Sequence, residues 1–210
     1  MRSSVIAIVD YGMGNRRSVE KALEHVGARA AITAEHDMIR SADGVILPGV
    51  GAFPRAMRNI EAAGLVEPLL DRYMAGGPIL GVCLGMQLLF GRSSEHESSA
   101  GLDFLAGEVR RHDTRGERLP HIGWNLVTFR RPSPLTEGLG DAAAFYHVHS
   151  FSCEPAQDED IVGLGEYGTP FVSIVERDNL MGVQFHPEKS SRDGLTLLSN
   201  FARICGRVAA

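Results

Sequence analysis

The stretch Ile79-Leu80-Gly81-Val82-Cys83-Leu84-Gly85-Met86-Gln87-Leu88-Leu89 joins an apolar run to a helical pattern at a single cysteine. The run is typical of a buried strand, and the spacing after Cys83 is typical of a helix. A residue on so tight a turn adopts strained dihedral angles and crowds its neighbours, so glycine at 81 and 85 has a steric reason. We interpret the stretch as a nucleophile elbow. It would present the Cys83 thiol above a sheet edge, in the positive potential of a helix N-terminus.

The sequence around the elbow predicts an α/β fold. Short apolar runs at 5–9, 44–47 and 79–82 alternate with amphipathic patterns at 16–26 and 65–74, which predicts a parallel sheet covered by helices. After about residue 107 the pattern changes to strands, at 126–129, 145–148, 172–176 and 180–184, before a closing helix at 192–204. The central sheet is therefore expected to be mostly parallel but mixed, and flanked by helices.

Length and composition favour a single domain that spans residues 1–210. The chain has 210 residues, of which 44% are hydrophobic, enough for one substantial core. A net charge of -5 with scattered Lys and Arg gives no electrostatic footprint for nucleic acid or anionic lipid. No signal sequence or membrane span is apparent, so a cytoplasmic location is expected. Residues 91–101 and the acidic run 158–160 are interpreted as surface loops.

The other cysteines and histidines offer weaker sites. Cys153 and Cys205 lack the elbow setting, and three cysteines far apart suggest neither a disulfide framework nor a Cys-x-x-Cys metal site. His147 and His149 alternate along a predicted strand and so share one face. Two ligands do not complete a zinc site, and partners at the usual spacing are absent, so we expect no metal and no cofactor.

A base for the thiol is suggested near the end of the chain. The sequence Gly182-Val183-Gln184-Phe185-His186-Pro187-Glu188 places His186 directly after an apolar strand. A thiol that attacks an amide needs a base that later returns a proton to the leaving group. Glu188, two residues on, is close enough to orient the imidazole, which is the third role of a catalytic triad. Cys83, His186 and Glu188 are therefore candidate catalytic residues.

Two segments are candidate oxyanion donors. The elbow supplies the backbone N–H of Leu84, the residue after the nucleophile. Pro48-Gly49-Val50-Gly51 follows a strand and would lie at the same carboxyl edge of the sheet, where α/β proteins bind ligands. Gly12-x-Gly14 also follows a strand and opens a helix, but Arg17 occupies the third glycine position of a dinucleotide-binding fingerprint, so nucleotide binding is disfavoured.

Taken together, these motifs resemble the class I, triad-type glutamine amidotransferases, which combine a glycine-rich oxyanion loop, a Gly-x-Cys-x-Gly elbow and a His-Pro-Glu in this order. Within the class, four segments resemble the glutaminase subunits of imidazole glycerol phosphate synthases of histidine biosynthesis. They are Asp10-Tyr11-Gly12-Met13-Gly14-Asn15, Pro48-Gly49-Val50-Gly51-Ala52-Phe53, Pro120-His121-Ile122-Gly123-Trp124-Asn125 and His186-Pro187-Glu188-Lys189-Ser190. The resemblance covers nearly the whole chain.

The resemblance implies roles for further residues. Gly51 and Gln87, with the segment His149, Ser150 and Phe151, would hold L-glutamine, and Gly49, Val50 and Gly51 would contribute to the oxyanion hole. Asn15 and Lys189 would face a partner subunit. The peptide of Val50 would have to reorient to complete the oxyanion hole, so the isolated chain would be nearly inactive until partner and ligand bind.

The implied reaction is hydrolysis of glutamine to glutamate and ammonia through a thioester on Cys83. In the family, ammonia passes through a channel to a (β/α)8-barrel cyclase, with which the glutaminase forms a heterodimer. The cyclase forms imidazole glycerol phosphate and the ribotide AICAR. Two alternatives stay open from the sequence: a glutaminase for anthranilate, guanylate or pyridoxal phosphate synthesis, and a non-catalytic regulatory partner. The intact triad residues argue against the second.

Overall fold

The computed structural model describes residues 5–96 and 98–208. Its strands are β1 (Val5–Val9), β2 (Arg29–Thr33), β3 (Gly44–Gly49), β4 (Ile79–Cys83), β5 (Phe90–Ser93), β6 (Ser99–Ala100), β7 (Leu105–Arg111), β8 (His121–Phe129), β9 (Ala142–His149), β10 (Phe151–Pro155), β11 (Ile161–Tyr167), β12 (Thr169–Arg177) and β13 (Leu180–Val183). Its helices are α1 (Arg16–His25), α2 (His36–Ser41), α3 (Phe53–Ala62), α4 (Val66–Met74), α5 (Leu84–Leu88) and α6 (Ser191–Val208), with short 3-10 turns at Pro134–Thr136, Asp158–Asp160 and Pro187–Lys189.

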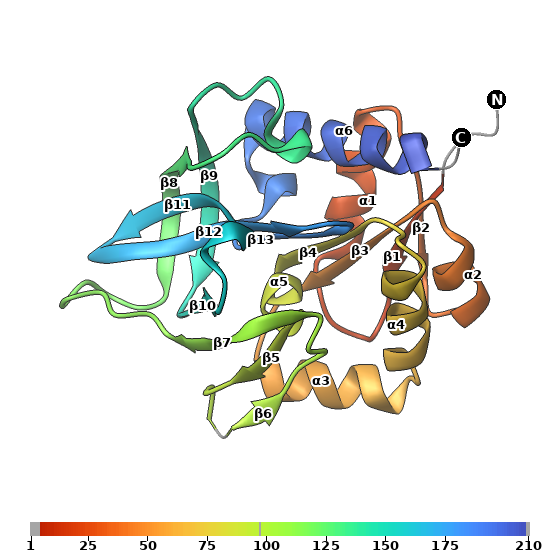
Figure 1. The fold of residues 1–210 in the computed structure, drawn as a ribbon, viewed down its shortest axis with the longest axis horizontal. Helices are drawn as coiled ribbons and strands as arrows, with labels where there is room; N and C mark the ends of the chain where they lie inside the picture. The colour runs from red at the N-terminus through yellow and green to blue at the C-terminus, as the bar shows by residue number, and fades with distance from the viewer. Residues whose placement is uncertain (1–4, 97, 209–210) are drawn as a thin grey trace.

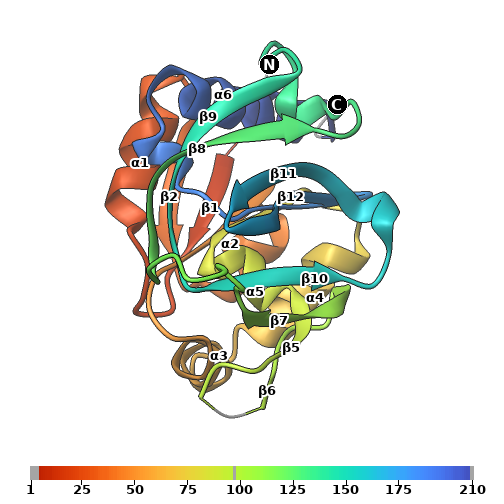
Figure 2. The same cartoon turned by 90° about the vertical axis from the view of Figure 1, so that its left-hand side faces the viewer.

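The described strands form one mixed sheet, with one parallel half and a second half in which all pairs except β5 with β7 are antiparallel. The order β2-β1-β3-β4-β13 is parallel throughout, as the alternating first part of the sequence predicts. Beyond β13 the pairing becomes antiparallel through β12, which pairs with β13 and β10 along one edge and with β11 along the other. Strand β11 continues into β8 and β9. Figures 1 and 2 show β8 and β9 side by side at one flank of the molecule.

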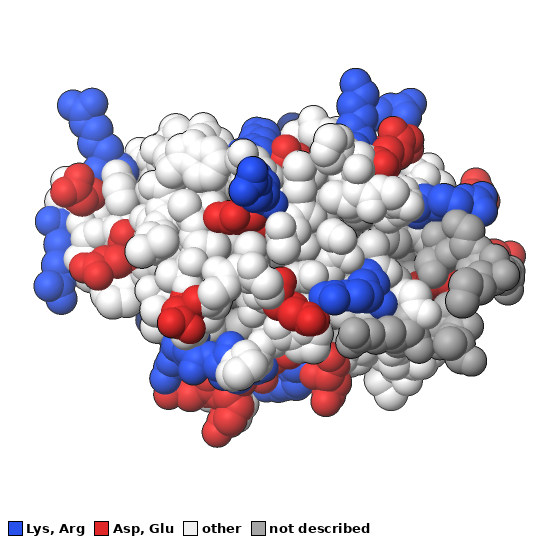
Figure 3. Space-filling view, turned by 90° about the horizontal axis from the view of Figure 1, so that it is seen from above, with Lys and Arg blue, Asp and Glu red and all other residues white. Residues whose placement is uncertain are grey.

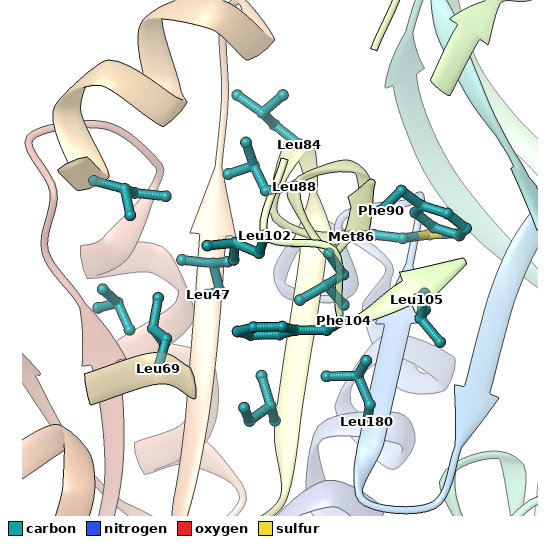
Figure 4. Packing of buried hydrophobic residues seen from close by; sticks show 14 of the residues in the cluster. Leu47, Leu69, Leu84, Met86, Leu88, Phe90, Leu102, Phe104, Leu105 and Leu180 are labelled. Atoms are coloured by element: carbon teal, nitrogen blue, oxygen red, sulfur yellow. The ribbon is translucent and has the colours of Figure 1, made fainter. Parts of the chain in front are cut away.

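Helices cover both faces of the parallel half, because successive side chains of a strand point to opposite faces. Ile6 and Ile8 of β1 pack with α1 and α6, whereas Ala7 and Val9 pack with α2, α3 and α4. Figure 1 shows α1 and α6 above the sheet and α3, α4 and α5 below it. The apolar residues of α5 lie in the lower core, where Figure 4 places Leu84, Met86 and Leu88 among side chains such as Leu47 and Phe104.

The loop predictions need correction. Residues 91–101 form the hairpin of β5 and β6 in their described part, and Ser93 is buried; residue 97 lies outside the described residues. The acidic run at 158–160 is a turn, but Asp160 is buried rather than solvated, because Arg177 binds both of its carboxylate oxygens. Cys153 and Cys205 are buried.

The surface and helices agree with the composition. Figure 3 shows acidic and basic side chains interspersed on the face seen from the α6 side. Within the described residues, no helix is both long enough and apolar enough to cross a membrane. The sheet instead converges on the carboxyl ends of β3, β4 and β13, which are neighbours in the sheet. These three strand ends lead into the candidate oxyanion loop, the Cys83 elbow and the His-Pro-Glu segment.

Candidate active site

Cys83 has the strained geometry that the elbow requires. It ends β4 and caps α5 with φ 56° and ψ -112°, in a region that residues with a side chain rarely adopt. The flanking glycines are needed for close packing. A Cβ atom on Gly85 would approach the Leu47 carbonyl oxygen to 1.8 Å, and one on Gly81 would lie 2.7 Å from the Gly85 oxygen. The backbone therefore holds the thiol at the N-terminus of α5.

Cys83, His186 and Glu188 lie together beside one pocket. The Nδ1–H of His186 donates to Glu188 Oε1 at 3.0 Å, and His186 and Cys83 line the same pocket, where the thiol lies 3.7 Å from the Val148 carbonyl oxygen. Burial alone would lower the pKa of His186, but the neighbouring side chains of Cys83 and Glu188 raise it to about 10. This environment favours an imidazolium at His186 beside the sulfur, which is the arrangement that activates a thiol at neutral pH.

Asn15 lies against the triad. Its Nδ2–H donates to Glu188 Oε1 at 3.2 Å, so one carboxylate oxygen accepts from both His186 and Asn15. The other oxygen, Glu188 Oε2, is buried and has no hydrogen-bond partner among the described residues. The expectation that Asn15 faces a partner remains a prediction, since the contact observed for its amide is with the carboxylate. Lys189 is exposed and lines the pocket above Cys83.

The oxyanion loop is fixed at one end. The Tyr11 hydroxyl donates to the Pro48 carbonyl at 2.7 Å, and burial raises the pKa of this tyrosine. Gly49 packs so closely against the elbow that a Cβ atom would lie 2.7 Å from that of Leu84. Beyond this point Val50 is exposed and Gly51 has φ +102°. The loop is thus pinned through Gly49 and open at Val50.

A pocket of about 260 Å³ brings most of the predicted residues together. It is lined by Val50, Gly51, Cys83, Leu84, Gln87, Glu95, Pro120, Val148, His149, Ser150, Phe151, His186 and Lys189. Three other predicted residues do not line the pocket: Gly49, Glu188 and Asn15. Gly49 packs against Leu84, and Glu188 accepts hydrogen bonds from His186 and Asn15. A larger hollow of about 710 Å³ around residues 129–141 is lined by neither a cysteine nor a histidine, so the chemistry points to the smaller pocket.

The sequence did not single out several residues of the pocket. Glu95 lies in the predicted loop, and Pro120 and Val148 lie at the ends of β8 and β9. Gln184 is fully buried, with Nε2 3.9 Å from Cys83 Sγ and Oε1 accepting from Gln87 at 3.1 Å. Its place in the strand before His186 was visible in the sequence, but its contact with Gln87 depends on the pairing of β4 with β13.

The paired histidines of β9 belong to a buried cluster with His112 and His121. Each of the four rings makes a hydrogen bond to a backbone carbonyl or to a neighbouring side chain. Burial, followed by the neighbouring imidazoles, lowers the pKa of His121 to about 4 and that of His149 to about 3. Across the described residues, no three His, Cys, Asp or Glu side chains are grouped as metal ligands.

The comparisons with known proteins agree with this geometry. The family model described as "Glutamine amidotransferase class-I" matches residues 7–205. The chain belongs to this family. The chain is accordingly a glutamine amidotransferase enzyme.

Similar curated proteins share one description. "Imidazole glycerol phosphate synthase subunit HisH" of Moorella thermoacetica is 50% identical over 199 residues, which cover 95% of this chain and 94% of that protein. Proteins with the same description are 46% identical in Desulfitobacterium hafniense (strain DSM 10664 / DCB-2) and 47% identical in Bacillus cereus (strain G9842), again over 95% of this chain and, respectively, 94% and 95% of those proteins.

Solved structures support the fold. A crystal structure described as that of a glutamine amidotransferase has a TM-score of 0.75 at 17% identity, covering 95% of this chain and 98% of that one. PurLQS from Thermotoga maritima has a TM-score of 0.76 at 19% identity, covering 96% and 98%. The predicted single α/β fold with a mixed sheet is confirmed.

Proposed function

We propose that the chain is the glutaminase subunit of an imidazole glycerol phosphate synthase and supplies ammonia from L-glutamine for histidine biosynthesis. The observation that carries the proposal is the triad of Cys83, His186 and Glu188 at the wall of a pocket sized for an amino acid. The description shared by relatives 46–50% identical over 95% of the chain supports this synthase over the anthranilate, guanylate and pyridoxal phosphate pathways. The intact triad supports an enzyme over a regulatory module.

The chemistry follows from the proton at His186. The Cys83 thiolate attacks the side-chain amide carbon of glutamine, and the carbonyl oxygen becomes an oxyanion. His186 gives its proton to the departing nitrogen, which leaves as ammonia, and a γ-glutamyl thioester remains. His186 then takes a proton from water, and the hydroxide attacks the thioester to release glutamate and restore the thiolate. Glu188 stabilises the imidazolium in both halves of the cycle.

The pocket supports a free amino acid as substrate. Glu95 and Lys189 both line it, so a carboxylate and an ammonium group are available for the two opposite charges of an α-amino acid. Both amide hydrogens of Gln87 Nε2 are engaged, one by the Phe151 carbonyl and one by Gln184 Oε1. The Gln87 Oε1 atom is left to accept a hydrogen bond from a ligand. Gly51, His149 and Ser150 would provide the remaining contacts.

The oxyanion hole would be completed by a backbone change at Val50. Leu84 offers its N–H from the start of α5, and the loop of Gly49, Val50 and Gly51 lies beside it. Because Tyr11 and the elbow hold the loop up to Gly49, a reorientation would be confined to the peptides on either side of Val50. Such an element with two states would let a partner control glutamine hydrolysis.

The partner would be the (β/α)8 cyclase subunit, in a heterodimer that carries ammonia between the two sites. The outward face of β8 supports a docking role, because Ile122, Trp124 and Leu126 remain 59%, 55% and 60% exposed in a row. Pro120 and Val148, at the same end of this β8–β9 ribbon as the Cys83 pocket, line the pocket itself. An apolar partner surface placed there would border Lys189. A cytoplasmic location goes with this role.

The test is Cys83→Ala in the assembled complex with the cyclase subunit. Glutamine-dependent synthesis should disappear, whereas synthesis from added ammonium salt should stay nearly unchanged, because only the ammonia source is lost. Labelling of the wild-type chain by a glutamine-like electrophile, followed by mass spectrometry, should locate the adduct on Cys83. Equal loss of both activities in the variant would make Cys83 structural and contradict the proposal.

A further inference from the structure

The buried histidines form a directed chain of hydrogen bonds that ends at the pocket. A carbonyl oxygen only accepts, so the 3.0 Å contact between His149 Nδ1 and the Phe151 carbonyl requires the Nδ1–H of His149 to donate. In the neutral ring, His149 Nε2 is then an acceptor. The Nδ1 atom of His121 lies 3.1 Å from it and must carry the hydrogen.

The same reasoning fixes the second ring. With its Nδ1 protonated, neutral His121 accepts at Nε2, where Asn125 Nδ2 lies 3.3 Å away. Asn125 Nδ2 also donates to the Glu166 carbonyl at 2.8 Å, which sets the orientation of the amide. The hydrogen bonds therefore run from Asn125 to His121 to His149 to Phe151, and each ring is confined to one tautomer. We name these four residues the imidazole relay.

The relay meets the catalytic side of the pocket at one atom. The Phe151 carbonyl accepts from His149 and also from Gln87 Nε2, at 3.1 Å. Gln87 in turn donates to Gln184, whose Nε2 lies 3.9 Å from Cys83 Sγ. Strand β8 therefore helps to orient Gln87, because His121 acts on the Phe151 carbonyl through His149. Both histidine rings are buried.

The rings are held neutral, as the relay requires. Burial and the nearby imidazoles lower the pKa of both His121 and His149. A second proton on His149 would set its Nε2–H against the Nδ1–H of His121, and a second proton on His121 would set its Nε2–H against the amide N–H of Asn125. The ring of His121 is also clamped by Tyr167, with ring centroids 4.1 Å apart and planes 17° apart.

From these contacts we propose that His121 is a positioning residue for glutamine: through His149 it fixes the Phe151 carbonyl and so the Gln87 amide. This inference rests on the proposed function, in which the pocket binds glutamine. It also gives a use to strand β8, whose inner face carries the relay while its outer face carries Ile122, Trp124 and Leu126. A change at His121 should reach substrate binding without touching the nucleophile.

The test compares three variants in the assembled complex. His121→Phe keeps a ring against Tyr167 but deletes the donor, and it should raise the KM for glutamine about 3- to 10-fold, the value of one net hydrogen bond, with little change in kcat. His121→Asn places an amide N–H near the position of Nδ1 and should restore the KM to within about 2-fold of wild type. His112→Phe is the matched control, because it alters a buried histidine of the same cluster that lies outside the relay.

A measurement on the unaltered chain guards against variants that fold poorly. Nitrogen-15 NMR of labelled histidine should show His121 and His149 protonated at Nδ1 and unprotonated at Nε2 over pH 6–8. A proton at Nε2 on either ring, or an equal rise in KM in His121→Asn and His121→Phe, would overturn the relay, as would a comparable rise in His112→Phe. A wild-type complex that makes no glutamate would refute the proposed function instead, and the tautomers would still decide the relay.

Discussion

Glu188 concentrates two hydrogen bonds on one oxygen. Its Oε1 atom accepts from His186 and from Asn15, while Oε2 is buried without a hydrogen-bond partner in the described part of the chain. A carboxylate so placed is held by its donors and by burial. Its charge is therefore directed at the imidazole, where it helps to raise the pKa of His186 to about 10.

The two triad partners of Cys83 should differ in their effect on turnover. His186→Asn removes the proton carrier and should be the more damaging change. Glu188→Gln keeps an acceptor for His186 but loses the charge, and it should lower glutaminase turnover by about 10² to 10⁴. Because the pKa of His186 would then fall, the alkaline limb of the pH–rate profile should move to lower pH. Turnover should be measured as glutamate released by the complex.

Two further results test the role of Glu188. An unchanged rate in Glu188→Gln would remove the carboxylate from the mechanism. Asn15→Ala serves as a comparison, since it deletes a neutral donor to the same oxygen and should cost less than the loss of the charge. A larger loss in Asn15→Ala than in Glu188→Gln would contradict the assigned roles.

The oxyanion loop is an element with one rigid end and one free end. Tyr11 holds the Pro48 carbonyl, and Gly49 leaves no room for a side chain against Leu84. Only from Val50 onward is the chain exposed, and Gly51 has the positive φ that favours glycine. The flanking glycines were visible in the sequence, but which of them is pinned was not.

Val50→Pro tests whether this loop provides the donor. The change deletes the N–H of Val50 and should lower the partner-stimulated turnover by about 10² to 10³ while the KM for glutamine changes little. Val50→Ala keeps the N–H and should retain the stimulated rate. Kinetics of the free chain and the complex, with and without cyclase substrate, measure the effect. If stimulation survives Val50→Pro, or appears mainly as a lower KM, the loop is not the switch and assembly of the pocket takes its place.

The elbow was predictable from local sequence, because Gly81 and Gly85 are required by the tight turn at Cys83. Strands β1, β3 and β4 were also predictable from their short apolar runs, but their order in the sheet was not. Strand β11 was missed, since Gly163 and Gly165 interrupt its pattern. In the structure these glycines admit the side chains of Val127 and Phe171. The need for glycine at these two positions therefore depends on residues of neighbouring strands, which the local sequence does not show.

The contacts that complete the site could not be predicted from the sequence, because they join residues that are far apart along the chain. Asn15 meets Glu188 across 173 positions, and Gln87 meets Gln184 across 97. Gln87 and His149 were predicted to bind glutamine only through the family resemblance. His121 acquires its role only from the register of β8 against β9, which sets it opposite His149.

The β8–β9 ribbon separates two environments. Its outer face carries the exposed apolar residues, and its inner face packs His121, His147 and His149 against β11 and β12. Burying neutral imidazoles makes the fold depend on pH, because the unfolded chain binds protons that the folded chain does not.

Stability should fall as pH decreases below about 6.5. Burial is the largest cause that lowers the pKa of His121, His147 and His149, to about 4, 2 and 3 respectively. Between about pH 6.5 and pH 4 the unfolded state therefore holds up to three more protons, and each contributes at most about 1.4 kcal/mol per pH unit to the loss. Near pH 6.5 His186 partly offsets this loss, because its raised pKa keeps it protonated in the folded state while only about half of the unfolded chains hold that proton. The offset fades toward about pH 5.5, and the stabilising effect of His186 is lost as pH rises from about 6.5 toward 10. Urea denaturation followed by circular dichroism at pH 7.5, 6.5 and 5.5 measures the slope.

In His147→Asn the amide can still donate to the Phe145 carbonyl, and the slope should decrease by about a third whatever the stability at pH 7.5. A free energy of unfolding that stays constant from pH 6.5 to pH 5.5, or an unchanged slope in the variant, would mean that these rings are protonated inside the folded protein.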